Sequence, residues 1–192
     1  MTIVPNQAKK EPAPGVQSSQ ATTAAPGAAT LVLGLGNPLL GDDGAGWKIV
    51  NQLRNQIPAQ EVEFDCLDCS GLALMERLVG YRRAILVDAV TTPKGKRGQV
   101  LCLSLDELGD PALGHLTSAH DTSLLSALEL ARQLGLPLPS PILLVGIEIQ
   151  PGYDCTESLS AAVQKAVPEA VERVRGLLAD LQATAETGPR PS

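Results

Sequence analysis

Two adjacent aspartates, Asp42 and Asp43, lie in a glycine-rich loop with the sequence GNPLLGDDGAG, residues 36–46. The spacing from Gly36 to Gly41 is that of a phosphate-binding loop, but the aspartates stand where that motif has Lys and Ser or Thr. Because carboxylates repel phosphate, the charge of the loop predicts a cationic partner. Asp42 has an ordinary explanation as a cap or turn residue, since Asp at a helix start accepts hydrogen bonds from exposed N–H groups.

Asp88 and His120 extend this loop to a set of three possible metal ligands. Asp88 ends the aliphatic run ILVD, where an unpaired buried carboxylate would be costly. The alternative for Asp88 is a structural acid bonded to neighbouring backbone amides. His120 precedes a predicted helix whose dipole favours the neutral, metal-binding imidazole, whereas His115 has no such context. Asp43, Asp88 and His120 therefore form a ligand set with open positions that suits a borderline divalent cation.

Other motifs for common chemistries are incomplete in this sequence. The dinucleotide-binding fingerprint fails because Leu39 stands in place of its third glycine. Cys66 and Cys69 have C-x-x-C spacing, but without a second such pair structural zinc or redox chemistry is disfavoured, and Cys66 is expected in the core. The motifs H-E-x-x-H and G-x-S-x-G are absent, and DTS at 121–123 is better explained as a helix start than as an aspartic-peptidase signature.

Short apolar runs alternate with helical patterns through the chain, which is typical of βα units that build a mostly parallel sheet. Because TTPKGKRG is too short for a parallel crossover, the strand after it is expected to pair antiparallel with the strand before it. Ligands of such sheets bind at the carboxyl ends of the strands, where Asp43 and Asp88 fall. Strands are predicted at residues 30–36, 62–68, 83–90, 99–105 and 140–150.

Helical spacing of apolar residues predicts helices after the aspartate loop, at 71–80, at 121–135 and from 158 to 181. The last of these contains Pro168. Because proline cannot donate to the helical hydrogen-bond ladder, a kink or break is expected there.

Composition limits the class of protein. The 192 residues suit one domain, predicted at 30–182, between tails at 1–29 and 183–192 that are expected to be disordered. A net charge of −6 and unclustered aromatic residues argue against nucleic acid as a partner. No apolar run is long enough to cross a bilayer and no signal peptide is evident, so a cytoplasmic location and reduced cysteines are expected.

Four segments in this order resemble the hydrogenase maturation endopeptidases: LVLGLGNPLLGDDGAGWKIV, ILVDAV, SAHDTSLLSAL and LLVGIEIQPG, which fall within residues 30–165. The resemblance implies a three-layer α/β/α sandwich with a twisted, mostly parallel mixed sheet of about five strands. It also implies a metal-dependent hydrolase, sometimes grouped with aspartic-type peptidases. Such an endopeptidase removes the C-terminal extension of the nickel–iron hydrogenase large-subunit precursor after nickel insertion.

The resemblance also implies a cofactor, partners and site residues. Nickel is expected to arrive in the precursor, and other divalent metals are expected to fit the site in vitro. The precursor is the expected partner of a monomer that binds neither nucleic acid nor membrane. A non-catalytic nickel-dependent chaperone or checkpoint and a small-molecule hydrolase are the alternatives. DCSG replaces the family's more usual DGGT-like run after its acid. The implied catalytic and metal-contacting residues are Asp43, Asp88 and His120, and the implied substrate-binding residues are Gly36, Asn37 and Asp68.

Overall fold

The computed structural model describes residues 29–58, 62–68, 71–105, 121–150, 152 and 155–186. The predicted tail at 1–29 therefore lies outside the described residues, apart from Ala29. The strands are β1 (Thr30–Leu35), β2 (Val62–Leu67), β3 (Arg83–Val90), β4 (Val100–Ser104) and β5 (Ile142–Glu148). The helices are α1 (Ala45–Arg54), α2 (Leu72–Leu78), α3 (Asp121–Gln133) and α4 (Ala161–Glu186), with a short 3-10 helix, η1 (Gly41–Gly44), before α1.

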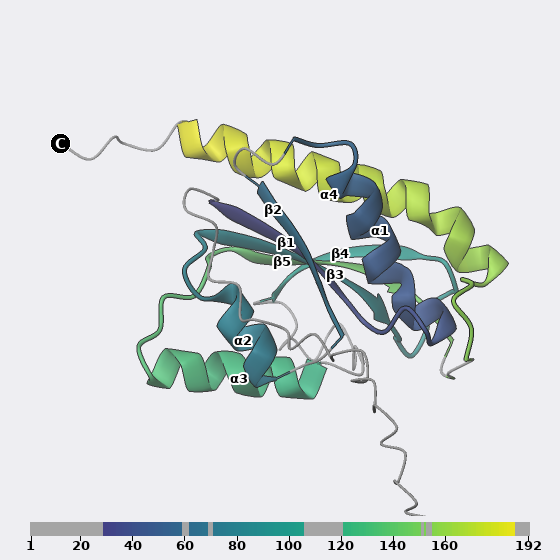
Figure 1. Ribbon diagram of the computed structural model, residues 1–192, viewed down its shortest axis with the longest axis horizontal. Helices are drawn as coiled ribbons and strands as arrows, with labels where there is room; N and C mark the ends of the chain where they lie inside the picture. Colours follow the sequence, from purple (N-terminus) through teal and green to yellow (C-terminus); the bar gives the residue numbers. More distant parts are fainter. Residues whose placement is uncertain are drawn as a thin grey trace, which may run out of the picture.

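These elements form three layers, as Figure 1 shows: helices α1 and α4 cover one face of the sheet, and α2 and α3 cover the other. The described strands make one five-stranded sheet, so the predicted α/β/α sandwich is confirmed. Within the described part of the chain, no helix is both long and apolar enough to cross a membrane.

The strand order is β2-β1-β3-β5-β4, with β4 antiparallel and the other pairings parallel. The mixed sheet was predicted, but the partner of β4 was not: β4 pairs with β5 instead of β3. The physical reason is burial. Strand β5 is buried along most of its length and takes the inner position, whereas β4 is only partly buried and forms the edge. The connection at 91–99 needs to cross only about 10 Å, two strand spacings.

Alternation along the strands divides the core into two aliphatic layers. On β3, Ile85 and Val87 face α1 and α4, whereas Leu86 faces α2 and α3. The predicted inward face of β2 is also found, because Val62 and Phe64 are buried and Cys66 packs against the same layer. A core built almost entirely from Leu, Ile, Val and Ala follows from the scarcity of aromatic residues in the sequence.

A kink or a break was expected at Pro168, and the break is wrong, because helix α4 runs without interruption from Ala161 to Glu186. The helix also continues past the predicted domain end at 182, and residues 187–192 lie outside the described part. Proline in a helix interior costs about 3 kcal/mol, but each large buried aliphatic side chain contributes about 1.5–3 kcal/mol. Pro168 is exposed, so the carbonyl that it leaves without a helical donor lies on the solvent side. The buried face that outweighs it includes Val163, Val167, Val171, Val174 and Leu178.

The start of α1 packs directly on the strand ends. A Cβ atom on Gly46 would lie 2.3 Å from the carbonyl oxygen of Val87 and 2.5 Å from that of Leu35. A Cβ atom on Gly34 would likewise lie 2.7 Å from the carbonyl oxygen of Gly46. Only glycine permits this approach, so the glycines bring the loop before α1 against the ends of both β1 and β3.

Candidate functional site

The loop that follows β1 requires glycine at its first position, Gly36. Gly36 has φ +107°, and a Cβ atom there would lie 2.0 Å from the carbonyl oxygen of Asp43. Asn37 then forms a turn, because its side-chain Oδ1 accepts a hydrogen bond from the N–H of Leu39 at 2.9 Å. Beyond this turn, the N–H of Gly41 donates to the carbonyl oxygen of Thr156 at 2.7 Å. The loop is therefore fixed both within itself and to the segment before α4.

Asp43 turns its carboxylate back into this loop. The residue is only 8% exposed, and its Oδ2 accepts a hydrogen bond from the N–H of Asn37 at 2.6 Å. Because α1 packs on the ends of β1 and β3, Asp43 lies at the carboxyl end of the sheet, where the parallel strands finish. The N–H of Asn37 holds this carboxylate, whereas Gly36 leaves room for the backbone carbonyl of Asp43. The resemblance implies both residues as substrate-binding residues.

Asp42 turns its carboxylate the other way. Its Oδ1 accepts a hydrogen bond from the N–H of Ser160 at 2.6 Å, and its Oδ2 lies 3.4 Å from Nη2 of Arg97. The sequence predicts a cap or turn role for Asp42, which does lie in the turn of η1, but neither η1 nor α1 has a side-chain cap bond. Asp42 instead accepts the N–H of Ser160, the residue before α4, which lies 118 positions away in the chain. Adjacent acids of one loop thus have different surroundings.

Asp88 lies in β3 near its end and is 2% exposed. Its Oδ1 accepts a hydrogen bond from the N–H of Ala89 at 2.8 Å, a contact that the structural alternative for this residue predicts. By alternation with Leu86 and Val90, the carboxylate belongs to the layer covered by α2 and α3. Helix α3 is the element that follows His120 in the chain.

The predicted trio is therefore placed only in part. Asp43 and Asp88 lie at the carboxyl ends of the neighbouring strands β1 and β3, and η1 contacts β3. His120 and His115 lie outside the described residues. Within the described residues, no group of three His, Cys, Asp or Glu side chains is close enough to hold a metal ion. The meeting of Asp43, Asp88 and His120 stays a prediction.

Asp68 is exposed and directly follows β2, also at the carboxyl end of the sheet. The indole Nε1 of Trp47 donates to the carbonyl oxygen of Leu67 at 3.4 Å, which connects α1 to the end of β2 beside Asp68. Nearby, burial raises the pKa of the Cys66 thiol to about 11, so this thiol stays protonated at neutral pH. This favours the core role predicted for Cys66 over metal or redox chemistry.

Sequence reasoning missed one buried acid at the carboxyl end of the sheet. Glu148, the last residue of β5, is 2% exposed, and its carboxylate accepts hydrogen bonds from the N–H of Thr92 at 2.7 Å and from its Oγ1 at 3.1 Å. Gly95 packs on the same carboxylate, because a Cβ atom there would lie 1.9 Å from Cδ of Glu148. The signal was available, since an acid ending an aliphatic strand is the pattern that singled out Asp88. Glu148 therefore holds the β3–β4 loop, residues 91–99, against the end of β5.

A second missed group joins β2 to α2. The guanidinium of Arg77, 9% exposed, donates to Asp65 at 2.6 Å and also to Glu63 and Tyr81. The hydroxyl of Tyr81 donates to Glu63 at 2.7 Å. Burial lowers the pKa of Arg77, but the bond to Asp65 and the neighbouring Tyr81 outweigh it and raise the pKa overall. The buried charge of Arg77 is thus paired with two acids, so the role of this group is structural.

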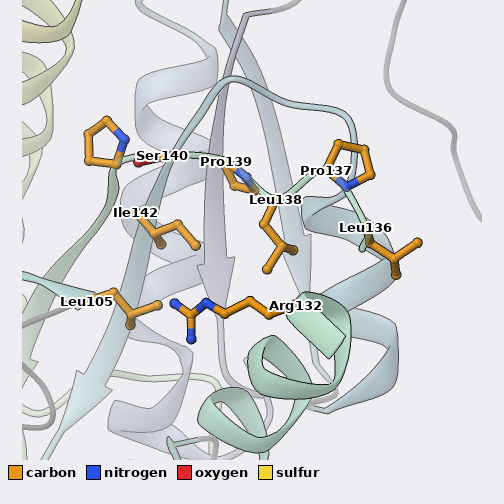
Figure 2. A pocket seen from close by; sticks show the side chains of 9 residues that line it. Leu105, Arg132, Leu136, Pro137, Leu138, Pro139, Ser140 and Ile142 are labelled. Carbon is orange, nitrogen blue, oxygen red and sulfur yellow. The ribbon is translucent and has the colours of Figure 1, made fainter. Parts of the chain in front are cut away.

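One cavity that described residues line lies away from the predicted site residues. It has a volume of about 430 Å³ and lies where α3 ends and β5 begins. Figure 2 shows Arg132 reaching from α3 across this cavity toward Leu105. A smaller cavity of about 120 Å³ borders η1 and α1, well below the usual size of a ligand pocket. Since parallel sheets bind ligands beyond their carboxyl ends, Asp43 and Asp88 identify the candidate site better than cavity size does.

Comparison with known proteins finds hydrogenase maturation enzymes. The family model described as hydrogenase maturation protease matches residues 48–176. The hydrogenase 2 maturation protease of Escherichia coli strain K12 is 29% identical over 150 residues, which are 76% of this chain and 90% of that protein. A solved hydrogenase maturating endopeptidase from E. coli has a TM-score of 0.65 and 30% identity over 79% of this chain and 92% of that one. The NiFe hydrogenase maturation protease from Thermococcus kodakarensis has a TM-score of 0.61 and 28% identity over 77% and 97%. The resemblance predicted from four segments is confirmed.

Proposed function

Because the chain belongs to the hydrogenase maturation protease family, we propose that it removes the C-terminal extension of a nickel–iron hydrogenase large-subunit precursor after nickel has been inserted. The observation that carries this proposal is a pair of buried carboxylates, Asp43 and Asp88, 8% and 2% exposed, at the carboxyl ends of adjacent parallel strands. Ligands of parallel sheets bind beyond this edge, and a cation brought by the substrate would match the charge of carboxylates placed there.

Nickel is part of the substrate in this proposal. Carboxylate and imidazole are suitable ligands for a borderline divalent ion, so Asp43, Asp88 and His120 would complete the coordination of nickel already held by the precursor. The carboxylate of Asp43 accepts the N–H of Asn37, and that of Asp88 accepts the N–H of Ala89. A precursor without nickel would lack the feature that docks it.

The proposed reaction is hydrolysis of one peptide bond. Nickel would polarise the scissile carbonyl group or the attacking water. The loop that holds Asp43 would fix the distance between this carboxylate and the peptide, because its backbone is bonded internally and to Thr156. A carboxylate also accepts a proton from water as a general base. Asp43 and Asp88 are both candidates for that step.

The test compares purified nickel-loaded and nickel-free precursor, with mass spectrometry of the released fragment. We expect the protein to cleave only the loaded precursor, and the variants Asp43→Asn, Asp88→Asn and His120→Ala to lose at least about 100-fold in rate, as groups that act on the reacting atoms do. Asp180→Asn, at an exposed position of α4, is the control and should cleave at the normal rate. Normal cleavage by all three site variants would refute the assignment.

The same experiment separates the alternatives. A nickel-dependent chaperone or checkpoint would bind the loaded precursor without releasing a fragment. A small-molecule hydrolase would do neither. We further propose a cytoplasmic monomer, and light scattering of the purified protein, alone and with precursor, tests the oligomeric state.

A further inference from the structure

Asp42 is a partly buried acid that the proposed reaction does not use. Its side chain is 9% exposed, and both of its oxygens have partners: the N–H of Ser160 at 2.6 Å and the guanidinium of Arg97 at 3.4 Å. The side chain of Arg97 is 36% exposed. The carboxylate therefore lies between the start of α4 and the β3–β4 loop.

The contact with Ser160 completes the cap of α4. Ser160 precedes the first residue of the helix, and its hydroxyl faces the N–H of Val163 at 3.5 Å. In a capping box, a Glu or Gln three residues into the helix would accept the N–H of the capping serine. That position holds Val163, which has no acceptor in its side chain, and Asp42 supplies the acceptor from another part of the chain.

The contact with Arg97 connects the same carboxylate to a loop that is itself held in place. Glu148 accepts two hydrogen bonds from Thr92 in that loop, and its backbone carbonyl accepts the N–H of Gly98 at 2.8 Å. Asp42 is thus fixed from two sides by separate elements. Because Asp42 and Asp43 are neighbours within the four residues of η1, fixing one restricts the backbone of the other.

We infer that Asp42 is a positioning residue for Asp43, an inference that rests on the proposed function. It anchors η1 to α4 and to the β3–β4 loop, so that the Asp43 carboxylate keeps one position. Arg97 compensates the charge of Asp42, which leaves Asp43 as the acid of the pair that meets a cation. In the competing role, Asp42 is itself a metal ligand, and removing the charge of Arg97 should then leave the cleavage rate unchanged.

The test measures kcat and KM for nickel-loaded precursor with Asp42→Asn, Arg97→Met and the double variant. Asn keeps an oxygen for the N–H of Ser160 but loses the charge that Arg97 meets. We expect each single variant to lower kcat by about 3–10-fold, with KM unchanged within about 2-fold, because small misplacement of a reacting group slows the reaction. The double variant should be no slower than the slower single variant, since both remove one shared interaction.

Asp42→Ala also removes the acceptor for Ser160 and should lower kcat by about 10–100-fold. Hydrogen exchange should show faster exchange of the Asn37 and Gly41 amides in this variant, while the urea midpoint of Arg97→Met stays at the wild-type value. Arg173→Met is the matched control, because it removes an ion pair of 3.5 Å from the exposed surface of α4 and should leave kcat unchanged.

Two outcomes would overturn the inference. One is a normal kcat in Arg97→Met and Asp42→Asn. The other is a loss in Asp42→Asn as large as in Asp43→Asn, with Arg97→Met normal, which would make Asp42 a ligand. Asp43→Asn separates this inference from the proposed function: if that variant cleaves normally, the proposed site is wrong, whatever the Asp42 variants do.

Discussion

Gly36 has no room for a side chain, because the carbonyl oxygen of Asp43 occupies the position where a Cβ atom would point, at 2.0 Å. Its φ of +107° adds backbone strain for any other residue. We expect Gly36→Ala to lower the free energy of unfolding by more than about 3 kcal/mol, since the loop must move. Urea denaturation measures the change.

Gly80 is the matched control for that substitution. Its φ of +93° is similar, but no atom lies within 4 Å of the place of a Cβ atom. Gly80→Ala should therefore cost only the backbone strain, about 1–2 kcal/mol. If both variants lost the same free energy of unfolding, the close approach of Gly36 to Asp43 would contribute nothing to the cost of the substitution.

The two aspartates show what sequence reasoning reaches at the residue scale. The loop and its negative charge were predictable from glycine spacing and residue type. The separate surroundings of Asp42 and Asp43 were not, because the partner of Asp42 is the N–H of Ser160, 118 residues away. Of the cap or turn role predicted for Asp42, the turn is found in η1, but the local cap is not, because tertiary structure supplies another donor.

At the scale of elements, the β3–β4 loop depends on one acid from β5. Glu148→Ala would leave the N–H and Oγ1 of Thr92 without their acceptor and open space beneath Gly95. We expect a loss of about 1–3 kcal/mol in the free energy of unfolding, the cost of an unsatisfied buried donor. Glu172→Ala, on the exposed surface of α4, should change it by less than about 0.5 kcal/mol. Equal denaturation midpoints in the two variants would contradict this role of Glu148.

The strands themselves were predicted within one or two residues, because alternation and continuous apolar runs are local signals. The pairing of β4 was not, since connection length limits which strands can be neighbours but does not say that β5 is inserted between β3 and β4. Pro168 is similar: its local cost is real, but the buried face of α4 outweighs it.

At the scale of the whole molecule, the resemblance of four ordered segments predicted the layers of the sandwich, and the fold agrees. The candidate site is less complete. Asp43 and Asp88 lie where parallel strands end, but His120 is outside the described residues. Interactions with residues distant in the chain, such as the cluster of Arg77 with Glu63 and Asp65, also escaped prediction, because neither partner follows from local spacing.

Two buried groups predict how the stability of the whole protein depends on pH. Burial raises the pKa of the Cys66 thiol from its ordinary 9.0 to about 11. Burial also raises the pKa of Tyr81, from 10.0 to about 12, although its bond with Arg77 lowers it in part. Above pH 9, the unfolded chain releases these protons while the folded protein still holds them. The unfolded state then binds fewer protons, so stability falls as pH rises.

We therefore expect the free energy of unfolding to be level with respect to these groups below pH 9.0 and to fall through the range up to about 12. Urea denaturation at several pH values between about 8 and 11 measures the slope of the free energy of unfolding against pH, because the two groups begin to titrate in this range. Cys66→Ala and Tyr81→Phe each remove one titrating group, so each should reduce the slope, whatever it does to stability at neutral pH. Since both groups add to the same difference in bound protons, the double variant should have the shallowest slope. An unchanged slope in both single variants would mean that other groups control the alkaline limit of the fold.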